Sequence, residues 1–97
     1  MSAVKDARGL CYSQAGRYLL KCGRSGILFH GRIFGGHPRR WINHAWVDLG
    51  DQVYCPHMGL LDSSLFYGLF DPQIESAYSS EEVAVNTLRF KHWGPWD

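Results

Sequence analysis

Residues 43–56 read NHAWVDLGDQVYCP, two runs rich in β-branched and aromatic residues joined by Gly50-Asp51. A two-residue link that contains glycine, set between strand-like runs, predicts a tight β-hairpin. If this link is the turn, Leu49 pairs with Gln52, and the rest of the register follows by counting outward. One face of the hairpin then collects six side chains: His44, Trp46, Asp48, Val53, Cys55 and His57.

This register predicts that His44 lies near two groups on the following strand. Counting from the turn places His57 directly opposite His44. Cys55 becomes the diagonal neighbour of His44, at about 7 Å between Cβ atoms, which is within side-chain contact. A slip of one residue would turn all of these side chains to the other face.

The residues before the hairpin predict one helix and one strand. Apolar residues recur at helical spacing from Cys11 to Cys22, and Gly23 follows. We therefore expect an amphipathic helix over residues 10–22 that begins at or just before Cys11, with Gly9 as its N-cap. The composition of residues 27–33 predicts a strand, so the first three strands are expected at 27–33, 43–49 and 52–56.

The residues after the hairpin predict shorter elements. Asp62 is a typical N-cap for a short helix through Phe70, which Asp71-Pro72 ends. Residues 79–82 match a capping box, which begins either a helix or a turn. Residues 88–93 alternate in polarity and are expected to form a closing edge strand. Together these elements predict an α+β fold in which the N-terminal helix packs on a small antiparallel sheet.

The size and composition of the chain restrict its class. Its 97 residues, 45% hydrophobic and 20% charged, suit one domain over residues 1–97 and exclude a disordered chain. The apolar runs are far shorter than the roughly 20 residues of a membrane span, and no leader pattern begins the chain. The odd number of cysteines, three, leaves at least one thiol free, which suits a reducing compartment or a reactive cysteine. We therefore expect a cytoplasmic protein with no membrane partner.

The charges are unevenly distributed along the chain. Residues 1–40 hold eight Lys and Arg against one acid, and residues 41–97 hold two against eight. An asymmetry of this kind marks some nucleic-acid-binding faces. In a domain this small the two halves pack together and neutralise each other, so a nucleic-acid partner is not expected.

Cys11 is the strongest candidate nucleophile. At the first turn of a helix, unpaired N–H groups and the helix dipole favour the thiolate, and the same groups can hold an oxyanion. A histidine on a strand packed against that helix end can take the thiol proton and later return it to the leaving group. His44 is expected in this role.

These segments resemble the transglutaminase-like branch of the papain-like cysteine hydrolases. The resemblance covers about residues 9–57: the cysteine helix, the LFHGR strand at 28–32 and the HAWVD strand at 44–48, followed by Val53-Tyr54. It implies a papain-like or transglutaminase-like core in which Cys11 is the nucleophile and His44 the general base. The third catalytic residue of the family, usually an Asp before a Pro, corresponds to Cys55.

The cysteine at position 55 leaves several arrangements open. Cys55 orients an imidazolium less well than a carboxylate does, and His57 could instead orient His44. Asp48 lies two same-face steps from His44. Trp46 between them would shield the pair, wall a substrate groove or pack in the core as an ordinary apolar side chain. A zinc ion on Cys11, His44, Cys55 and His57, and a redox link between Cys11 and Cys55, are less favoured alternatives.

The sequence therefore predicts a thiol-dependent hydrolase or acyl transferase that acts on a peptide or amide bond, of the cysteine peptidase or amidase type. This chemistry requires no cofactor and no metal. Its partner would be a peptide or protein. The alternative is a non-catalytic protein-binding module on the same scaffold, such as an inhibitor from a phage or mobile element, because the chain is rich in aromatic residues that can anchor an interface.

Overall fold

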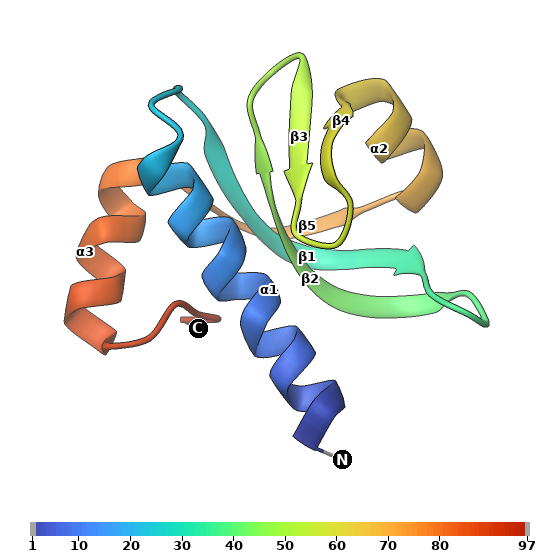
Figure 1. Ribbon diagram of the computed structural model, residues 1–97, viewed down its shortest axis with the longest axis horizontal. Helices are drawn as coiled ribbons and strands as arrows, with labels where there is room; N and C mark the ends of the chain where they lie inside the picture. Colours follow the sequence, from blue (N-terminus) through green and yellow to red (C-terminus); the bar gives the residue numbers. More distant parts are fainter. Residues whose placement is uncertain (1, 97) are drawn as a thin grey trace.

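The computed structural model describes residues 2–96, with side chains from residue 10 onward, as three helices and a five-stranded antiparallel sheet (Figure 1). The predicted α+β class is confirmed. Strand order across the sheet is β4-β3-β2-β1-β5. The elements follow the chain as α1 (Ser2–Lys21), β1 (Ile27–Gly35), β2 (Arg40–Asp48), β3 (Gln52–Cys55), β4 (Gly59–Asp62), α2 (Ser63–Phe70), β5 (Gln73–Tyr78) and α3 (Ser80–Phe90).

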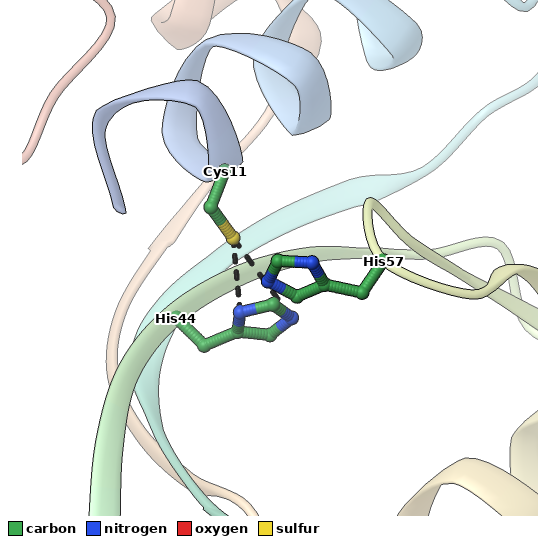
Figure 2. A group of neighbouring side chains, drawn as sticks. All are labelled: Cys11, His44 and His57. Atoms are coloured by element: carbon green, nitrogen blue, oxygen red, sulfur yellow. Dashed lines mark hydrogen bonds between the residues drawn. The ribbon is translucent and has the colours of Figure 1, made fainter. Parts of the chain in front are cut away.

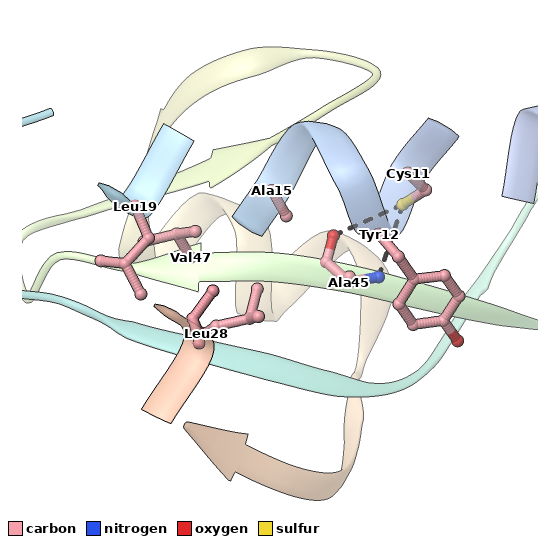
Figure 3. Close-up of a cluster of buried hydrophobic side chains, with 8 residues drawn as sticks. Cys11, Tyr12, Ala15, Leu19, Leu28, Ala45 and Val47 are labelled. Atoms are coloured by element: carbon pink, nitrogen blue, oxygen red, sulfur yellow. Dashed lines mark hydrogen bonds between the residues drawn. The ribbon is translucent and has the colours of Figure 1, made fainter. Parts of the chain in front are cut away.

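The sheet separates two hydrophobic clusters because successive strand residues point to opposite faces. On one face α1 and α3 pack over the sheet, and Figure 3 shows part of this cluster. Its buried members are Cys11, Tyr12, Ala15, Leu19, Leu28, Ala45, Val47 and Val83. On the other face α2 covers the cluster of Ile33, Trp46, Val53, Cys55 and Phe66.

The β2–β3 hairpin has the predicted turn and register. The Leu49 N–H donates to the Gln52 carbonyl at 2.8 Å, and Asp48 pairs with Val53. The ladder is short, because β3 ends at Cys55 and is followed by Pro56. Continued in this register, Pro56 would stand opposite Ala45, and proline has no N–H to donate to a partner strand. Within the described residues, this edge of β2 therefore has no partner strand from Ala45 back toward Arg40.

Helix α1 begins much earlier than the sequence predicts. It starts at Ser2 and passes through Gly9, so the expectation of a helix over residues 10–22 with Gly9 as N-cap is wrong at its start. No proline interrupts this segment, and a glycine inside a helix costs only about 1 kcal/mol. Cys11 therefore lies midway along α1. None of the helices in the described part of the chain is long and apolar enough to cross a membrane.

The C-terminal half follows the predicted caps but not the predicted strand. Asp62 stands at the N-cap position of helix α2, but its side chain makes no capping hydrogen bond, whereas α3 begins with a complete capping box on Ser79. The edge strand expected at 88–93 is wrong, because α3 continues to Phe90 and an irregular segment follows. The edge strand is instead β5, which lies so close to β1 that a Cβ on Gly31 would collide with the Gln73 carbonyl.

Candidate functional site

Cys11 from α1 and His44 from β2 form a hydrogen-bonded pair in the structure (Figure 2). The distance from Cys11 Sγ to His44 Nδ1 is 2.9 Å, and the distance to Nε2 is 3.9 Å. Each residue is only 2% exposed. The sequence predicts that these two side chains meet, and the Sγ–Nδ1 distance confirms the contact. Their catalytic roles stay a prediction.

The pair meets at the open edge of β2. By strand alternation His44 belongs with Trp46 to the face that α2 covers, whereas Cys11 comes from α1 on the other face. Beyond the end of β3, the Ala45 N–H donates to Cys11 Sγ at 3.4 Å, and the thiol lies 3.5 Å from the Ala45 carbonyl (Figure 3). The sulfur thus takes the place that a strand neighbour would occupy.

Cys55 contacts the second nitrogen of the same ring. Its Sγ lies 3.3 Å from His44 Nε2, so His44 stands between two thiols. The backbone N–H groups of His57 and Met58 also face the Cys55 sulfur and lower its pKa, although burial raises that pKa by more. Toward these two backbone N–H groups the Cys55 sulfur is an acceptor, as a carboxylate at this position would be.

His57 lies on the turn between β3 and β4 and is exposed. Its ring stacks on the His44 ring, with centroids 5.4 Å apart and an interplanar angle of 14°. Within the described residues no hydrogen bond joins the two rings, so His57 contacts His44 by stacking, and its role in orienting His44 stays a prediction. One ligand atom of His57 lies within 4.8 Å of both Cys11 and His44.

Trp46 and Asp48 lie away from the thiol. Trp46 is fully buried among the residues under α2, and its ring stacks with that of His44 at 6.2 Å between centroids. Trp46 therefore packs in the core beside the His44 ring and does not line an open groove. Asp48 accepts from the Tyr67 hydroxyl at 2.6 Å and from the Gly50 N–H at 2.8 Å. Asp48 therefore stabilises the hairpin turn and α2.

Burial makes both members of the Cys11–His44 pair neutral at pH 7. Loss of solvent raises the pKa of Cys11 to about 12, which the Ala45 N–H opposes only in part. Loss of solvent and the neighbouring His57 lower the pKa of His44 to about 4. The predicted activation of Cys11 by a helix end is wrong, because α1 begins at Ser2 and the N–H groups midway along a helix bond to its own carbonyls.

Two contacts at this site escape prediction from side-chain patterns. They are the Ala45 N–H beside Cys11 and the turn N–H groups beside Cys55. The sequence signal that could have predicted them is Pro56. A proline directly after a strand ends the ladder of that strand and leaves backbone N–H and C=O groups of the neighbouring strand without a partner there.

A neutral thiol hydrogen-bonded to a neutral imidazole can give up its proton as the sulfur reacts, and thiolate with imidazole is also a ligand set for soft metal ions. No protein-family model, no curated protein and no solved structure matches the chain.

Proposed function

We propose that the protein catalyses thiol-dependent acyl chemistry, hydrolysis or transfer, on a peptide or amide bond, with Cys11 as nucleophile and His44 as general base. The observation that carries the proposal is the 2.9 Å contact between Cys11 Sγ and His44 Nδ1, in a ring whose other nitrogen is held by Cys55. A nucleophile within hydrogen-bond reach of a base, which is itself oriented by a third group, is the arrangement that activates thiols.

In the proposed reaction the Cys11 sulfur attacks the substrate carbonyl while its proton moves to His44 Nδ1. The imidazolium then donates that proton to the leaving amine, and a thioester on Cys11 results. Water, or an acceptor amine in the transfer reaction, attacks the thioester with His44 again as base, and the thiol is restored. Among the described residues no strand pairs with Ala45 on this side, and its N–H is a backbone donor beside the sulfur.

The electrostatics favour a concerted proton transfer over a preformed ion pair. Burial disfavours both the thiolate and the imidazolium, so the two charges form together with the attack on the carbonyl. Cys55 is a neutral third group and stabilises the imidazolium less than a carboxylate would. The proposed enzyme is therefore a slow one compared with a thiol hydrolase that has an acid at this position.

The order of elements supports the papain-like part of the proposal. A helix carries the cysteine, a later strand carries the histidine, and the end of the next strand carries the third group. This order agrees with the transglutaminase-like branch of the papain-like hydrolases. Two features depart from that pattern: Cys55 replaces a carboxylate, and Cys11 lies within its helix.

Acylation by an activated ester tests the proposal. The reduced protein is incubated with p-nitrophenyl acetate in the presence of a chelator, and intact mass and peptide mapping locate the acyl group. We expect acetyl-Cys11 in the native chain and in Cys22→Ala, which is the matched thiol control. Cys11→Ala and His44→Gln should lose the adduct. Acylation confined to Cys22, or an unchanged rate in His44→Gln, contradicts the proposal.

A fluorogenic peptide amide library then separates an enzyme for amides from a thiol that reacts only with activated esters. We expect release of the fluorophore that depends on both Cys11 and His44. The protein-binding module is the second candidate, because Cys11 is 2% exposed while several large apolar side chains of β4, α2 and the turn before β4 are exposed: Met58, Leu60, Leu65 and Leu69. Absence of turnover across the library, with retained folding, favours that module.

A further inference from the structure

The same cluster has the composition and spacing of a metal site. Cys11, His44 and His57 each offer one ligand atom, and these three atoms lie within 4.8 Å of one another (Figure 2). We propose that these three residues bind one Zn²⁺ ion. This proposal stands on the ligand geometry alone and does not depend on the proposed acyl chemistry.

The ligand types select the class of metal. One thiolate and two imidazoles suit zinc and its spectroscopic substitute Co²⁺, whereas Mg²⁺ and Ca²⁺ require oxygen ligands. Zinc–sulfur bonds of about 2.3 Å and zinc–nitrogen bonds of about 2.0 Å place a tetrahedral sulfur and nitrogen about 3.5 Å apart and two nitrogens about 3.3 Å apart. The Cys11–His44 contact at 2.9 Å must therefore open slightly, and the three ligand atoms, now within 4.8 Å of one another, must close around the ion.

The surroundings of the cluster allow these movements. His57 is exposed on the turn between β3 and β4, so its side chain can shift without disturbing the core. Three protein ligands leave the fourth tetrahedral position to water. If Nδ1 of His44 binds the ion, Nε2 keeps Cys55 as its partner, and metal-bound histidines usually have such a second contact.

This arrangement corrects the four-residue zinc set considered from the sequence. Within the described residues the group includes Cys11, His44 and His57 but not Cys55. Cys55 Sγ contacts the other nitrogen of His44, so Cys55 is an outer partner of the histidine. Binding breaks the Cys11 S–H bond, releases that proton to solvent and forms a zinc–sulfur bond. The bound ion therefore withdraws Cys11 from any reaction as a nucleophile.

Titration of the reduced, chelator-stripped full chain with Co²⁺ tests the site. We expect one equivalent to bind, with a thiolate-to-cobalt charge-transfer band and the intense visible bands of a tetrahedral ion, and one equivalent of Zn²⁺ to displace it. Cys11→Ser should lose the charge-transfer band. His57→Gln should bind at least about tenfold more weakly. Matched controls are His37→Gln, an exposed histidine on the β1–β2 turn, and Cys22→Ser; both should bind as the native chain does.

Thermal unfolding of the same samples shows whether each variant is folded, so loss of metal binding can be separated from loss of structure. A charge-transfer band that persists in Cys11→Ser, or equal affinities in His57→Gln and His37→Gln, overturns the proposal. Weak octahedral cobalt spectra in the native chain also overturn it. These measurements contain no substrate and the acylation assay contains a chelator, so failure of the metal site and failure of the proposed function are separate results.

Discussion

Replacing Cys55 with aspartate should raise the pKa of His44 so that its ring titrates near neutral pH. The Cys55 sulfur lies 3.3 Å from His44 Nε2, so a carboxylate there faces the ring nitrogen directly. Opposite charges about 4 Å apart attract by about 4 kcal/mol at an effective dielectric constant of 20. At 1.36 kcal/mol per unit, this raises the pKa of His44 by about 3 units. The starting value is about 4, so the variant should titrate near 7.

The surroundings of position 55 suit the new charge. The backbone N–H groups of His57 and Met58 already face the Cys55 sulfur and would donate to the carboxylate. They offset part of the cost of burying it. The assay is an NMR titration of the His44 ring Cε1–H between about pH 3 and 9, with chelator present. Cys55→Asn is the matched control, because it has the same shape without the charge.

Two outcomes of the His44 titration would contradict this expectation. If the pKa of His44 shifts by less than about 1 unit in Cys55→Asp, or by the same amount in Cys55→Asn, the carboxylate does not act on the imidazole. The third position of the triad would then be wrongly assigned. If the shift is as large as expected, the acylation rate of Cys11 at pH 7 should rise with it, because the imidazolium formed during attack is stabilised.

Four further predictions follow from burial and capping. Iodoacetamide at pH 7 should alkylate Cys11 more slowly than the half-buried Cys22, because burial raises the pKa of Cys11 to about 12 and shields its sulfur. Mass mapping of a time course measures the two rates, and faster labelling of Cys11 would contradict this prediction. Burial lowers the pKa of His44 from 6.5 to about 4, so folding favours its neutral form. Its contribution to the free energy of unfolding is therefore full above pH 6.5, and about 3 kcal/mol is lost as the pH falls from 6.5 to 4. Urea unfolding at several pH values should show a smaller acid loss in His44→Gln, and parallel curves would refute the linkage. Ser79→Ala should lower the free energy of unfolding by about 1 kcal/mol through loss of the capping box, with Ser79→Asp near the native value. Phe66→Ala should lower it by about 3–5 kcal/mol, because Phe66 is fully buried under α2, and a loss below 1 kcal/mol would show that α2 does not seal this face.

The sequence predicts the hairpin and the contact between Cys55 and His44 because the signals there are local. A glycine-containing two-residue turn fixes the register, and the register alone brings Cys55 to His44. The same holds for the two caps, where Asp62 and Ser79 precede their helices. In each case the information lies within a few residues of the feature that it determines.

The features that sequence reasoning misses depend on distant contacts or on missing stop signals. Nothing at Gly9 ends the helix that begins at Ser2, so the start of α1 depends on residues with weak preferences. Residues 73–78 form a strand because they pair with β1. The stretch 88–93 alternates in polarity, but a strong N-cap at Ser79 begins a helix that runs through Phe90. The depth at which Cys11 is buried depends on the crossing of α1 over the sheet, which no local pattern specifies.

The proline after β3 also affects the tendency of this protein to aggregate. An exposed strand edge with unpaired N–H and C=O groups is a template on which another chain can add a strand. At Ala45 the template is occupied by the Cys11 thiol, which contacts both the N–H and the C=O of that residue. Removal of this sulfur, as in Cys11→Ala, would leave the N–H and C=O of Ala45 open to a strand from another chain. The thiol that contacts His44 therefore also covers a β-edge, and the expected consequence of losing it is aggregation by strand addition.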